Sequence, residues 1–309
     1  MEINLLHEKF VFGKLENFEG TYSGTGSRFL TDNVQLDIVI RLKANCVVPQ
    51  HVGCSLVNGF YYAIVDVISG RILWHDVVAL EGIEKEIALF RNNNHKELMC
   101  EIFFPILNEI DYLILKTEKE ILNIQNGEKI FFWGGPLTYG IGVTAANFMF
   151  SNIITRRLKL DGYNFARQLN DFFDTSKMDI SRMLNILKDS KPAYFISELG
   201  GKGMKIDQIE NELYNFLMVL ATFEGTHFFF LEEDSFYMTE EKCKRKKRTR
   251  ELLKYFNSNK KFQIINMDDV FQNGSNDRYF YSSNFYNDYA NIEIAKYCLP
   301  IIKSWKYGD

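Results

Sequence analysis

One segment organises the second half of the chain: Ile130-Phe-Phe-Trp-Gly-Gly-Pro-Leu-Thr-Tyr-Gly-Ile-Gly142. A short apolar run leads into four glycines and one proline, and a segment with helical spacing of apolar residues follows. This order predicts a buried strand, a tight turn and a crossover helix. In α/β proteins the end of such a strand displays reacting groups, because the turn brings backbone N–H groups and one side chain to the sheet edge.

Strand-like and helix-like segments alternate along the rest of this half. We expect strands at residues 129–133, 163–166, 193–199, 226–231 and 262–266. We expect helices near residues 145–160, 180–188, 206–220, 240–256 and 288–304. Five strands separated by helices predict a parallel sheet with right-handed crossovers and helices on both faces. Residues 128–309 are therefore predicted to form a three-layer, flavodoxin-like α/β domain.

The first 120 residues have a different pattern. Alternating or β-branched runs lie at residues 34–42, 59–67, 85–89, 98–104 and 111–115, spaced by roughly ten residues and without a long helical period. This pattern predicts an antiparallel β-sandwich of the jelly-roll kind over residues 1–120. The polar residues 117–128 are the expected link between the two domains.

Composition bounds the function. The chain has 309 residues, 46% hydrophobic and 15% aromatic, so a globular protein with two cores is expected. Its net charge of −4 argues against a nucleic-acid partner. No signal peptide or membrane span is recognisable, so we expect a cytoplasmic protein. The five cysteines are scattered, which favours free thiols, and no histidine spacing indicates a metal; no cofactor is expected.

The glycine-rich turn resembles the first block of the SGNH (GDSL) hydrolases, Gly-Asp-Ser-Leu-Thr-Tyr-Gly. Gly134 and the run from Leu137 to Gly140 match this block, whereas Gly135 replaces the aspartate and Pro136 replaces the nucleophilic serine. The segment from Thr21 to Asp32 resembles the β-sandwich that precedes the catalytic domain in one SGNH subgroup. The resemblance implies the same two-domain architecture and an ancestry in acyl-ester chemistry.

The other blocks of that family are also altered. Ala166 stands at a glycine whose N–H serves the oxyanion, and Lys202 stands at an oxyanion-binding asparagine. Ser282 falls at the orienting aspartate, and Phe285 falls at the catalytic histidine. A serine esterase needs a nucleophile, a base, an orienting acid and oxyanion donors, so the resemblance implies that family-type hydrolysis is lost.

Three functions stay open from the sequence. The first is a degenerate SGNH-like protein that binds a sugar-bearing or acylated ligand, or a protein partner. Its candidate ligand-binding residues are Gly135, Thr138, Tyr139, Lys202, Ser282 and Tyr286. The second is an esterase or acyltransferase in which Ser282 or Ser283 is the nucleophile and Lys202 the base. The third is an assembly protein that acts through the β-sandwich, for which an exposed apolar patch on residues 1–120 would be the sign.

Two biased runs allow more than one interpretation. Residues 242–250 contain seven basic side chains, which we interpret as the solvated face of an outer helix whose charge is offset by nearby acids, rather than as a nucleic-acid patch. The aromatic residues between 279 and 289 either pack in the core or stack on a ligand at the mouth of a cleft; core packing is the preferred interpretation.

Overall fold

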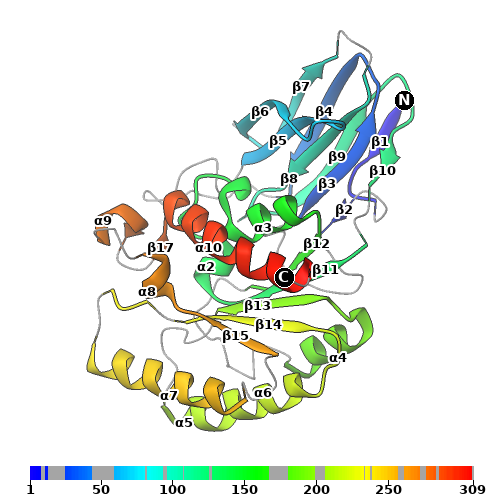
Figure 1. Cartoon of the computed structure of the whole chain (residues 1–309). Helices are drawn as coiled ribbons and strands as arrows, with labels where there is room; N and C mark the ends of the chain where they lie inside the picture. The colour runs from blue at the N-terminus through cyan, green and yellow to red at the C-terminus, as the bar shows by residue number, and fades with distance from the viewer. Residues whose placement is uncertain are drawn as a thin grey trace.

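The computed structural model describes residues 1–7, 11–12, 25–43, 59–80, 82–92, 96–106, 108–124, 127–166, 180–198, 206–232, 234–236, 239–256, 261–271, 276–282 and 285–307. These residues form a β-sandwich and an α/β part, which lie one above the other in Figure 1.

The β-sandwich consists of two antiparallel sheets. One has the order β1 (Glu2–Asn4), β9 (Ile110–Lys116), β4 (Gln35–Leu42) and β7 (Glu84–Arg91). The other has the order β10 (Leu122–Asn123), β3 (Gly26–Thr31), β8 (Leu98–Phe103), β5 (Gly59–Asp66) and β6 (Ile72–Ala79), and β2 (Val11–Phe12) pairs with β3. Alternate residues such as Ile38 and Ile40 of β4 meet Phe60 and Ile64 of β5 in one buried core, because side chains along a strand point to opposite faces.

The predicted antiparallel β-sandwich is confirmed, although strands β1, β2, β3, β6 and β10 lie outside the runs expected from the sequence. Residues 122–123, expected to belong to the polar link, form strand β10, in which Leu122 lies opposite Leu30 and Asn123 opposite Phe29. The segment stays in the sheet of β3 because its backbone extends the ladder at the outer edge of that strand.

The α/β part is built on a five-stranded sheet in which every neighbouring pair is parallel. Its order is β12 (Asp161–Asn164), β11 (Lys129–Trp133), β13 (Tyr194–Glu198), β14 (His227–Leu231) and β15 (Phe262–Ile265). The predicted parallel sheet is therefore confirmed. Strand β12 ends at Asn164, two residues earlier than expected, because the Asn164 side chain accepts the Ala166 N–H in place of a ladder partner.

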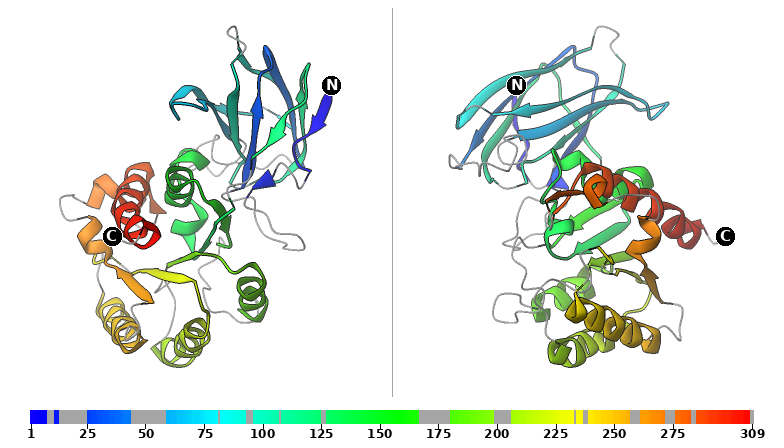
Figure 2. Two further views of the ribbon diagram at one scale, coloured as in Figure 1. Left: turned by 45° about the vertical axis from the view of Figure 1, so that its right-hand side comes forward. Right: turned by 90° about the vertical axis from the view of Figure 1, so that its left-hand side faces the viewer.

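Helices cover both faces of this sheet, as the two views in Figure 2 show. Alternate strand residues face the two sides: Phe131, Phe195 and Phe228 pack with α4 (Ile180–Ser190), α6 (Tyr214–Ala221) and α7 (Glu240–Phe256). Phe132 and Phe229 pack on the other side with α3 (Phe150–Leu158) and α10 (Asp288–Tyr307). Because both faces are buried, the strands are almost wholly apolar.

Shorter elements connect these layers. They are α2 (Pro136–Tyr139), the 3₁₀ turn η1 (Ala146–Phe148), α5 (Ile206–Gln208), the π-helical η2 (Ile209–Leu213), α8 (Met267–Val270), α9 (Asn276–Tyr279), and the hairpin of β16 (Phe280–Ser282) and β17 (Phe285–Tyr286). The helix expected at residues 145–160 is thus split, and it ends at Leu158 because Lys159 adopts a left-handed conformation (φ 53°).

A separate apolar cluster joins the two parts. Tyr61, Phe103 and Ile106 of the sandwich pack against Tyr139 and Met149 of the α/β part. The β-sandwich therefore lies directly against the turn that follows β11. Within the described ranges, no helix is both long and apolar enough to cross a membrane.

Candidate functional site

The carboxyl ends of the five parallel strands meet at one edge of the sheet, where α/β proteins place their ligands. Pro136 begins α2 directly after β11, and α2 contacts β17, which begins at Phe285. Ser282 of β16 pairs with Phe285 across the hairpin. The fold thus brings together three positions that the sequence comparison singled out, although they are almost 150 residues apart along the chain.

A carboxylate closes the turn after β11. One oxygen of Glu198, the last residue of β13, accepts the N–H of Gly135 at 2.9 Å, the N–H of Thr138 at 3.2 Å and the hydroxyl of Thr138 at 3.0 Å. Three donors of the turn are therefore used by a single acceptor from within the protein. Glu198 is 63 residues from Gly135, and no local pattern in the sequence indicates that it takes part in this turn.

The environment of Glu198 shifts its acidity. Burial removes water from the carboxyl group and raises its pKa from the ordinary 4.5, and the hydrogen bonds from Thr138 and Gly135 oppose this rise. Desolvation outweighs the hydrogen bonds, so the pKa of Glu198 is raised. This carboxyl group holds its proton to a higher pH in the native state than in the unfolded chain.

Gly134 must be glycine for this arrangement to exist. A Cβ at this position would lie 2.3 Å from the Thr138 hydroxyl oxygen and 2.7 Å from both the Cβ and the Oε2 of Glu198. The close approach of β11 and β13 at their ends leaves no space for a side chain.

A second intramolecular cap lies beside the turn. The Asn164 side chain donates to the carbonyl of Thr138 at 2.7 Å, and its oxygen accepts the N–H of Ala166 at 2.9 Å. Asn164 and Ala166 are buried. Ala166 stands at the glycine position whose N–H serves the oxyanion in the SGNH hydrolases. Alanine retains that N–H, but here it already has an acceptor.

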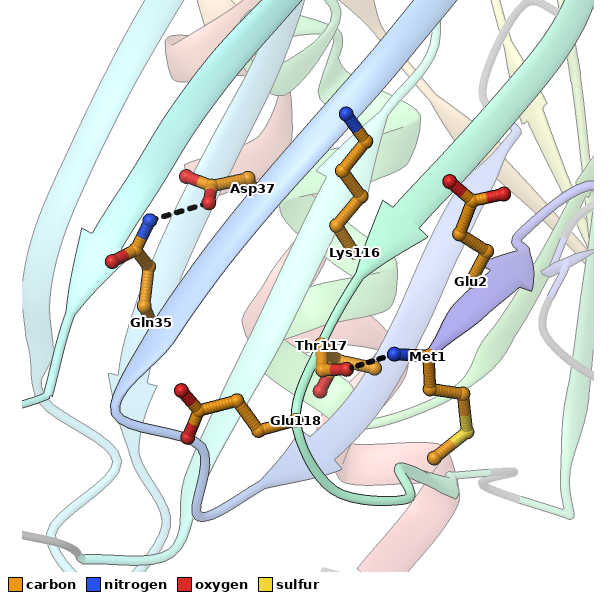
Figure 3. A pocket seen from close by; sticks show the side chains of 7 residues that line it. All are labelled: Met1, Glu2, Gln35, Asp37, Lys116, Thr117 and Glu118. Atoms are coloured by element: carbon orange, nitrogen blue, oxygen red, sulfur yellow. Dashed lines mark hydrogen bonds between the residues drawn. The ribbon is translucent and has the colours of Figure 1, made fainter.

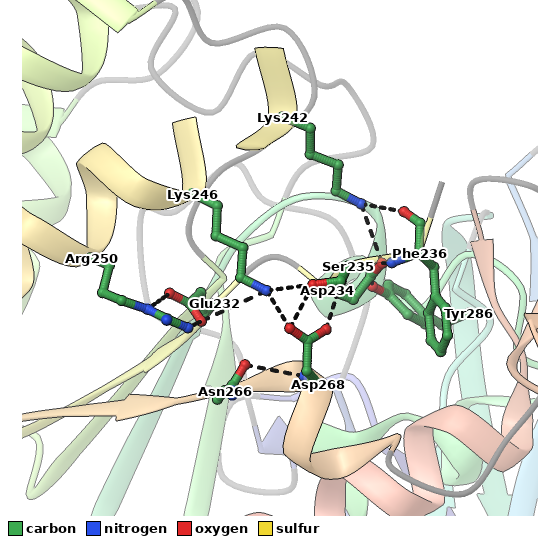
Figure 4. A network of polar contacts seen from close by, with 10 residues as sticks. All are labelled: Glu232, Asp234, Ser235, Phe236, Lys242, Lys246, Arg250, Asn266, Asp268 and Tyr286. Atoms are coloured by element: carbon green, nitrogen blue, oxygen red, sulfur yellow. Dashed lines mark hydrogen bonds and ion pairs between the residues drawn. The ribbon is translucent and has the colours of Figure 1, made fainter. Parts of the chain in front are cut away.

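The hairpin before α10 is fixed by a polar network, shown in Figure 4. The Tyr286 hydroxyl donates to Asp234, and the Lys242 ammonium group donates to Asp234 at 3.2 Å and to the carbonyl of Phe236 at 2.8 Å. Asp234 and Lys242 are both buried. The network ties β17 to the end of β14 and to α7.

The comparisons with known proteins agree on the architecture. No protein-family model and no curated protein sequence matches the chain. A protein described as a GDSL-like lipase from Bacteroides ovatus superposes with a TM-score of 0.78 and 16% identity, over 98% of this chain and 97% of its own. The salicylyl-acyltransferase SsfX3 of a tetracycline biosynthetic pathway superposes with a TM-score of 0.73 and 10% identity, over 99% and 98%. The chain has the SGNH-hydrolase fold.

A third structure of this fold also spans both parts of the molecule. It is a carbohydrate esterase whose active site is described as having divergent catalytic and non-catalytic binding functions. It superposes with a TM-score of 0.53 and 10% identity, over 95% of this chain and 96% of its own. The combination of a β-sandwich with an SGNH fold is therefore shared along the whole length of all three structures.

The candidate ligand-binding residues of the SGNH turn are mostly engaged internally. Thr138 and Tyr139 are buried, and the Tyr139 hydroxyl donates to the carbonyl of Ile106 at 3.3 Å, across the boundary with the β-sandwich. A ligand could accept a hydrogen bond from either hydroxyl only if it displaced the present acceptor. Lys202 and Ser283 lie outside the described residues.

The basic run on α7 is not simply a solvated face. Lys242, Lys246 and Arg250 recur at intervals of four and line one side of the helix (Figure 4). Lys246 pairs with Asp268 at 2.6 Å, and Arg250 forms two bonds with Glu232, one of them at 2.7 Å. Their partners are acids that follow β14 and β15, namely Glu232, Asp234 and Asp268. This side of α7 faces the protein because a carboxylate removed from water is stable only when it is paired.

Two further basic residues pair with acids of the same helix. Lys244 binds Glu240 at 2.6 Å at the surface, whereas Arg245 is itself buried and binds the exposed Glu241 at 3.4 Å. The expected offset of the basic charge by neighbouring acids is therefore present, although Lys242, Arg245 and Lys246 are largely removed from solvent.

The aromatic loop is largely core. Tyr279 is buried and its ring lies tilted against that of Phe271 with 4.5 Å between centroids, and Phe236 contacts both Tyr279 and Phe280. Tyr286 also packs against Phe271. These contacts favour the packing interpretation over a row of rings that is free to stack on a ligand.

The histidine of the α/β part lies at the wrong edge for catalysis. His227 begins β14, at its amino end, where its ring lies 4.6 Å from that of Trp305. Burial, together with the charge of Lys261, lowers its pKa. It cannot act as a base beside Pro136 because the length of a strand separates the two edges.

Other candidate sites are weaker. No group of three metal-ligating side chains occurs in the part of the chain that the structure describes. An open depression of about 360 Å³ is lined by Met1, Glu2, Gln35, Asp37, Lys116, Thr117 and Glu118 (Figure 3). It lies on the β-sandwich rather than at the carboxyl edge of the parallel sheet.

Proposed function

We propose that this SGNH-fold protein does not hydrolyse esters by Ser-His-Asp chemistry, and that it binds a sugar-bearing or acylated ligand at the carboxyl edge of its parallel sheet. The observation that carries the proposal is the occupied turn after β11. Pro136 offers neither a hydroxyl nor an N–H, and the neighbouring N–H groups of Gly135 and Thr138 already bind Glu198.

The expected loss of activity is large. Removing the nucleophile or the base of a catalytic triad alone lowers turnover on the order of a millionfold. This chain has Pro136 at the first position and Phe285 at the second, and phenylalanine cannot accept a proton. Of the oxyanion donors that usually preserve residual catalysis, the N–H at position 136 is absent in proline and the N–H of Ala166 is engaged by Asn164.

The ligand class is suggested by the structural neighbours. One is named as an acyltransferase, and another is a carbohydrate esterase whose active site is credited with non-catalytic binding. A site of this fold that retains affinity for an acylated sugar without cleaving it is the simplest function consistent with the altered positions.

Hydrolysis is tested directly with p-nitrophenyl acetate and acetylated oligosaccharides. We expect no turnover above background from the wild-type protein. Rebuilding the triad with Pro136→Ser, Ser282→Asp and Phe285→His should give low but measurable turnover. The matched triple variant with Pro136→Ala should remain inactive. Turnover by the wild-type protein that disappears in Lys202→Ala would contradict the proposal and favour the alternative acyl-transfer chemistry.

Binding is tested by calorimetry with an acetylated oligosaccharide and its deacetylated counterpart. We expect the acetylated form to bind more tightly and to be recovered intact by mass spectrometry. Equal affinity for the two forms would contradict recognition of the acyl group. The variant Tyr286→Phe keeps the ring and removes the hydroxyl, so it shows whether the hairpin contributes through packing alone.

A further inference from the structure

The hairpin of β5 and β6 carries an unusual concentration of exposed apolar side chains. Eleven large apolar residues are exposed in the described part of the chain, and five of them lie in this hairpin, within the eight-residue stretch 67–74. They are Val67 (42% exposed), Ile68 (98%), Ile72 (39%), Leu73 (46%) and Trp74 (51%). We call these five residues the hairpin patch.

The outer strand of this hairpin has a free edge. Among the described residues, β6 is the last strand of its sheet and its one partner is β5; it lies at the side of the sandwich in Figures 1 and 2. Every residue of β6 from Ile72 to Asp76 is exposed. β5, by contrast, is buried from Gly59 to Val65. The hairpin thus presents β6 as an uncovered strand with unpaired backbone groups on its outer side.

Natural edge strands usually carry lysine, proline or inward-pointing charges that prevent pairing with another strand. β6, Ile-Leu-Trp-His-Asp-Val-Val-Ala, contains no lysine or proline, and its one acid is Asp76. A bulge at Leu73, which is skipped in the pairing of β6 with β5, is the protective feature that is present. An apolar edge with so little protection is the mark of an interaction surface.

We propose that the hairpin patch packs against the same patch of a second copy of this chain, with the two β6 strands antiparallel around a twofold axis. The charges at the ends of the patch suit this direction. Arg71 precedes the apolar run and Asp76 follows it, so antiparallel strands bring Arg71 of each copy next to Asp76 of the other. Parallel strands would instead place like charges together.

The size of the patch also fits a second copy. The exposed area of its five side chains is on the order of 400–500 Å² in each copy, so two copies together bury roughly 1,000 Å² with the adjoining backbone, the lower bound for a specific interface. Trp74 is the expected anchor because a large, rigid ring gains most from burial. Its indole N–H already donates to the Tyr62 hydroxyl at 3.0 Å, which fixes its orientation before association.

The test is the molar mass in solution, measured by light scattering and sedimentation from about 1 to 100 µM, a span over which a dimer of micromolar affinity dissociates. We expect a dimer at the upper end for the wild-type protein. Ile68→Lys with Leu73→Lys should raise the dissociation constant at least tenfold. Met218→Lys with Tyr255→Lys, at exposed apolar positions of the α/β part, is the matched control and should leave the dimer unchanged.

Several outcomes overturn the inference. A wild-type protein that is monomeric at all concentrations excludes the second copy, even if the patch then binds a different protein. A dimer that survives Ile68→Lys with Leu73→Lys, while thermal unfolding shows both variants folded, places the interface elsewhere. Because none of these residues lies at the sheet edge proposed to bind ligand, each proposal can fail without the other.

A crosslink tests the antiparallel direction independently. The pairing of Arg71 with Asp76 places position 72 of one copy opposite position 75 of the other, within the Cα separation that a disulfide spans. Ile72→Cys with His75→Cys in a Cys243→Ser background should therefore crosslink 72 to 75 under mild oxidation, as peptide mapping would show, whereas Met218→Cys in the same background should not crosslink. A dimeric double-cysteine protein that stays uncrosslinked, or that links 72 to 72, would refute the proposed direction.

Discussion

Replacing Glu198 is the sharpest test of how the turn after β11 is held. Its Oε2 accepts three bonds, two of them from the backbone N–H groups of Gly135 and Thr138. The Glu198→Ala variant leaves those two donors without an acceptor, and neither can turn away. A buried donor left unpaired costs about 1–3 kcal/mol, so we expect a loss of about 3–4 kcal/mol in the free energy of unfolding.

The Glu198→Gln variant separates hydrogen bonding from charge. All three donors bind a single oxygen, and the amide oxygen of glutamine can take the same place. We therefore expect its free energy of unfolding at pH 7 to lie within about 1 kcal/mol of the wild-type value. A glutamine variant as unstable as the alanine variant would show that the three bonds do not hold the turn.

The pH dependence follows from the raised pKa of Glu198. The native state binds this proton more tightly than the unfolded chain, so the resulting stability is fully present below the ordinary pKa of 4.5. It is lost as the pH rises through the higher native pKa. Glutamine lacks this titration, so the stability of Glu198→Gln relative to wild type should increase as the pH rises above 4.5.

Urea unfolding at a series of pH values measures these differences. Of the three tryptophans, Trp133 and Trp305 lie in the α/β part, so a Trp74→Phe background confines the fluorescence signal to it. A difference between wild type and Glu198→Gln that stays constant from pH 4 to pH 8 would refute the assigned burial of the carboxyl group.

Two further substitutions test the polar network of Figure 4. Tyr286→Phe removes the hydroxyl that binds Asp234 and should lower the free energy of unfolding by about 1–2 kcal/mol, whereas Tyr255→Phe, at an exposed ring, should change it by less than about 0.5 kcal/mol in the same urea titration. Lys242→Met leaves the buried Asp234 carboxylate without its cation and should lower the free energy of unfolding by about 3 kcal/mol. Lys244→Met, on the exposed side of α7, should be nearly neutral. Equal effects of the two lysine variants would argue against a buried pair.

The sequence predicted the architecture because its strongest signals are local. Phe228, Phe229 and Phe230 form a continuous apolar run, which is what a strand covered on both faces requires, and polar or glycine-rich turns separate such runs. The helix at residues 240–256 was predicted with the bounds that the structure has. The end of β12 was missed because a single side chain, Asn164, decided it, and the end of α3 was missed because the backbone of Lys159 turns left-handed.

The candidate site was predicted less completely because its contacts are not local. The resemblance identified Pro136 and Phe285, but the acceptor that fills the turn, Glu198, is 63 residues from Gly135. Likewise, Asp268, in the short helix α8 that follows β15, binds Lys246, which is 22 residues earlier in the chain. Lys242, Lys246 and Arg250 are spaced by four residues, and this spacing is visible in the sequence. The sequence does not show, however, which side of helix α7 packs against the acids that follow β14 and β15.

The bonds that stabilise the turn also limit what it can bind. An anion would need N–H donors, but those of Gly135 and Ala166 have acceptors, and Pro136 has none. When Glu198 is ionised, a second negative charge about 4 Å away is opposed by about 4 kcal/mol at an effective dielectric constant of 20. A ligand at this edge should therefore present a neutral group to the turn, as an acetyl ester does. Tighter binding of a free carboxylate than of its methyl ester, at a pH where Glu198 is ionised, would contradict this argument.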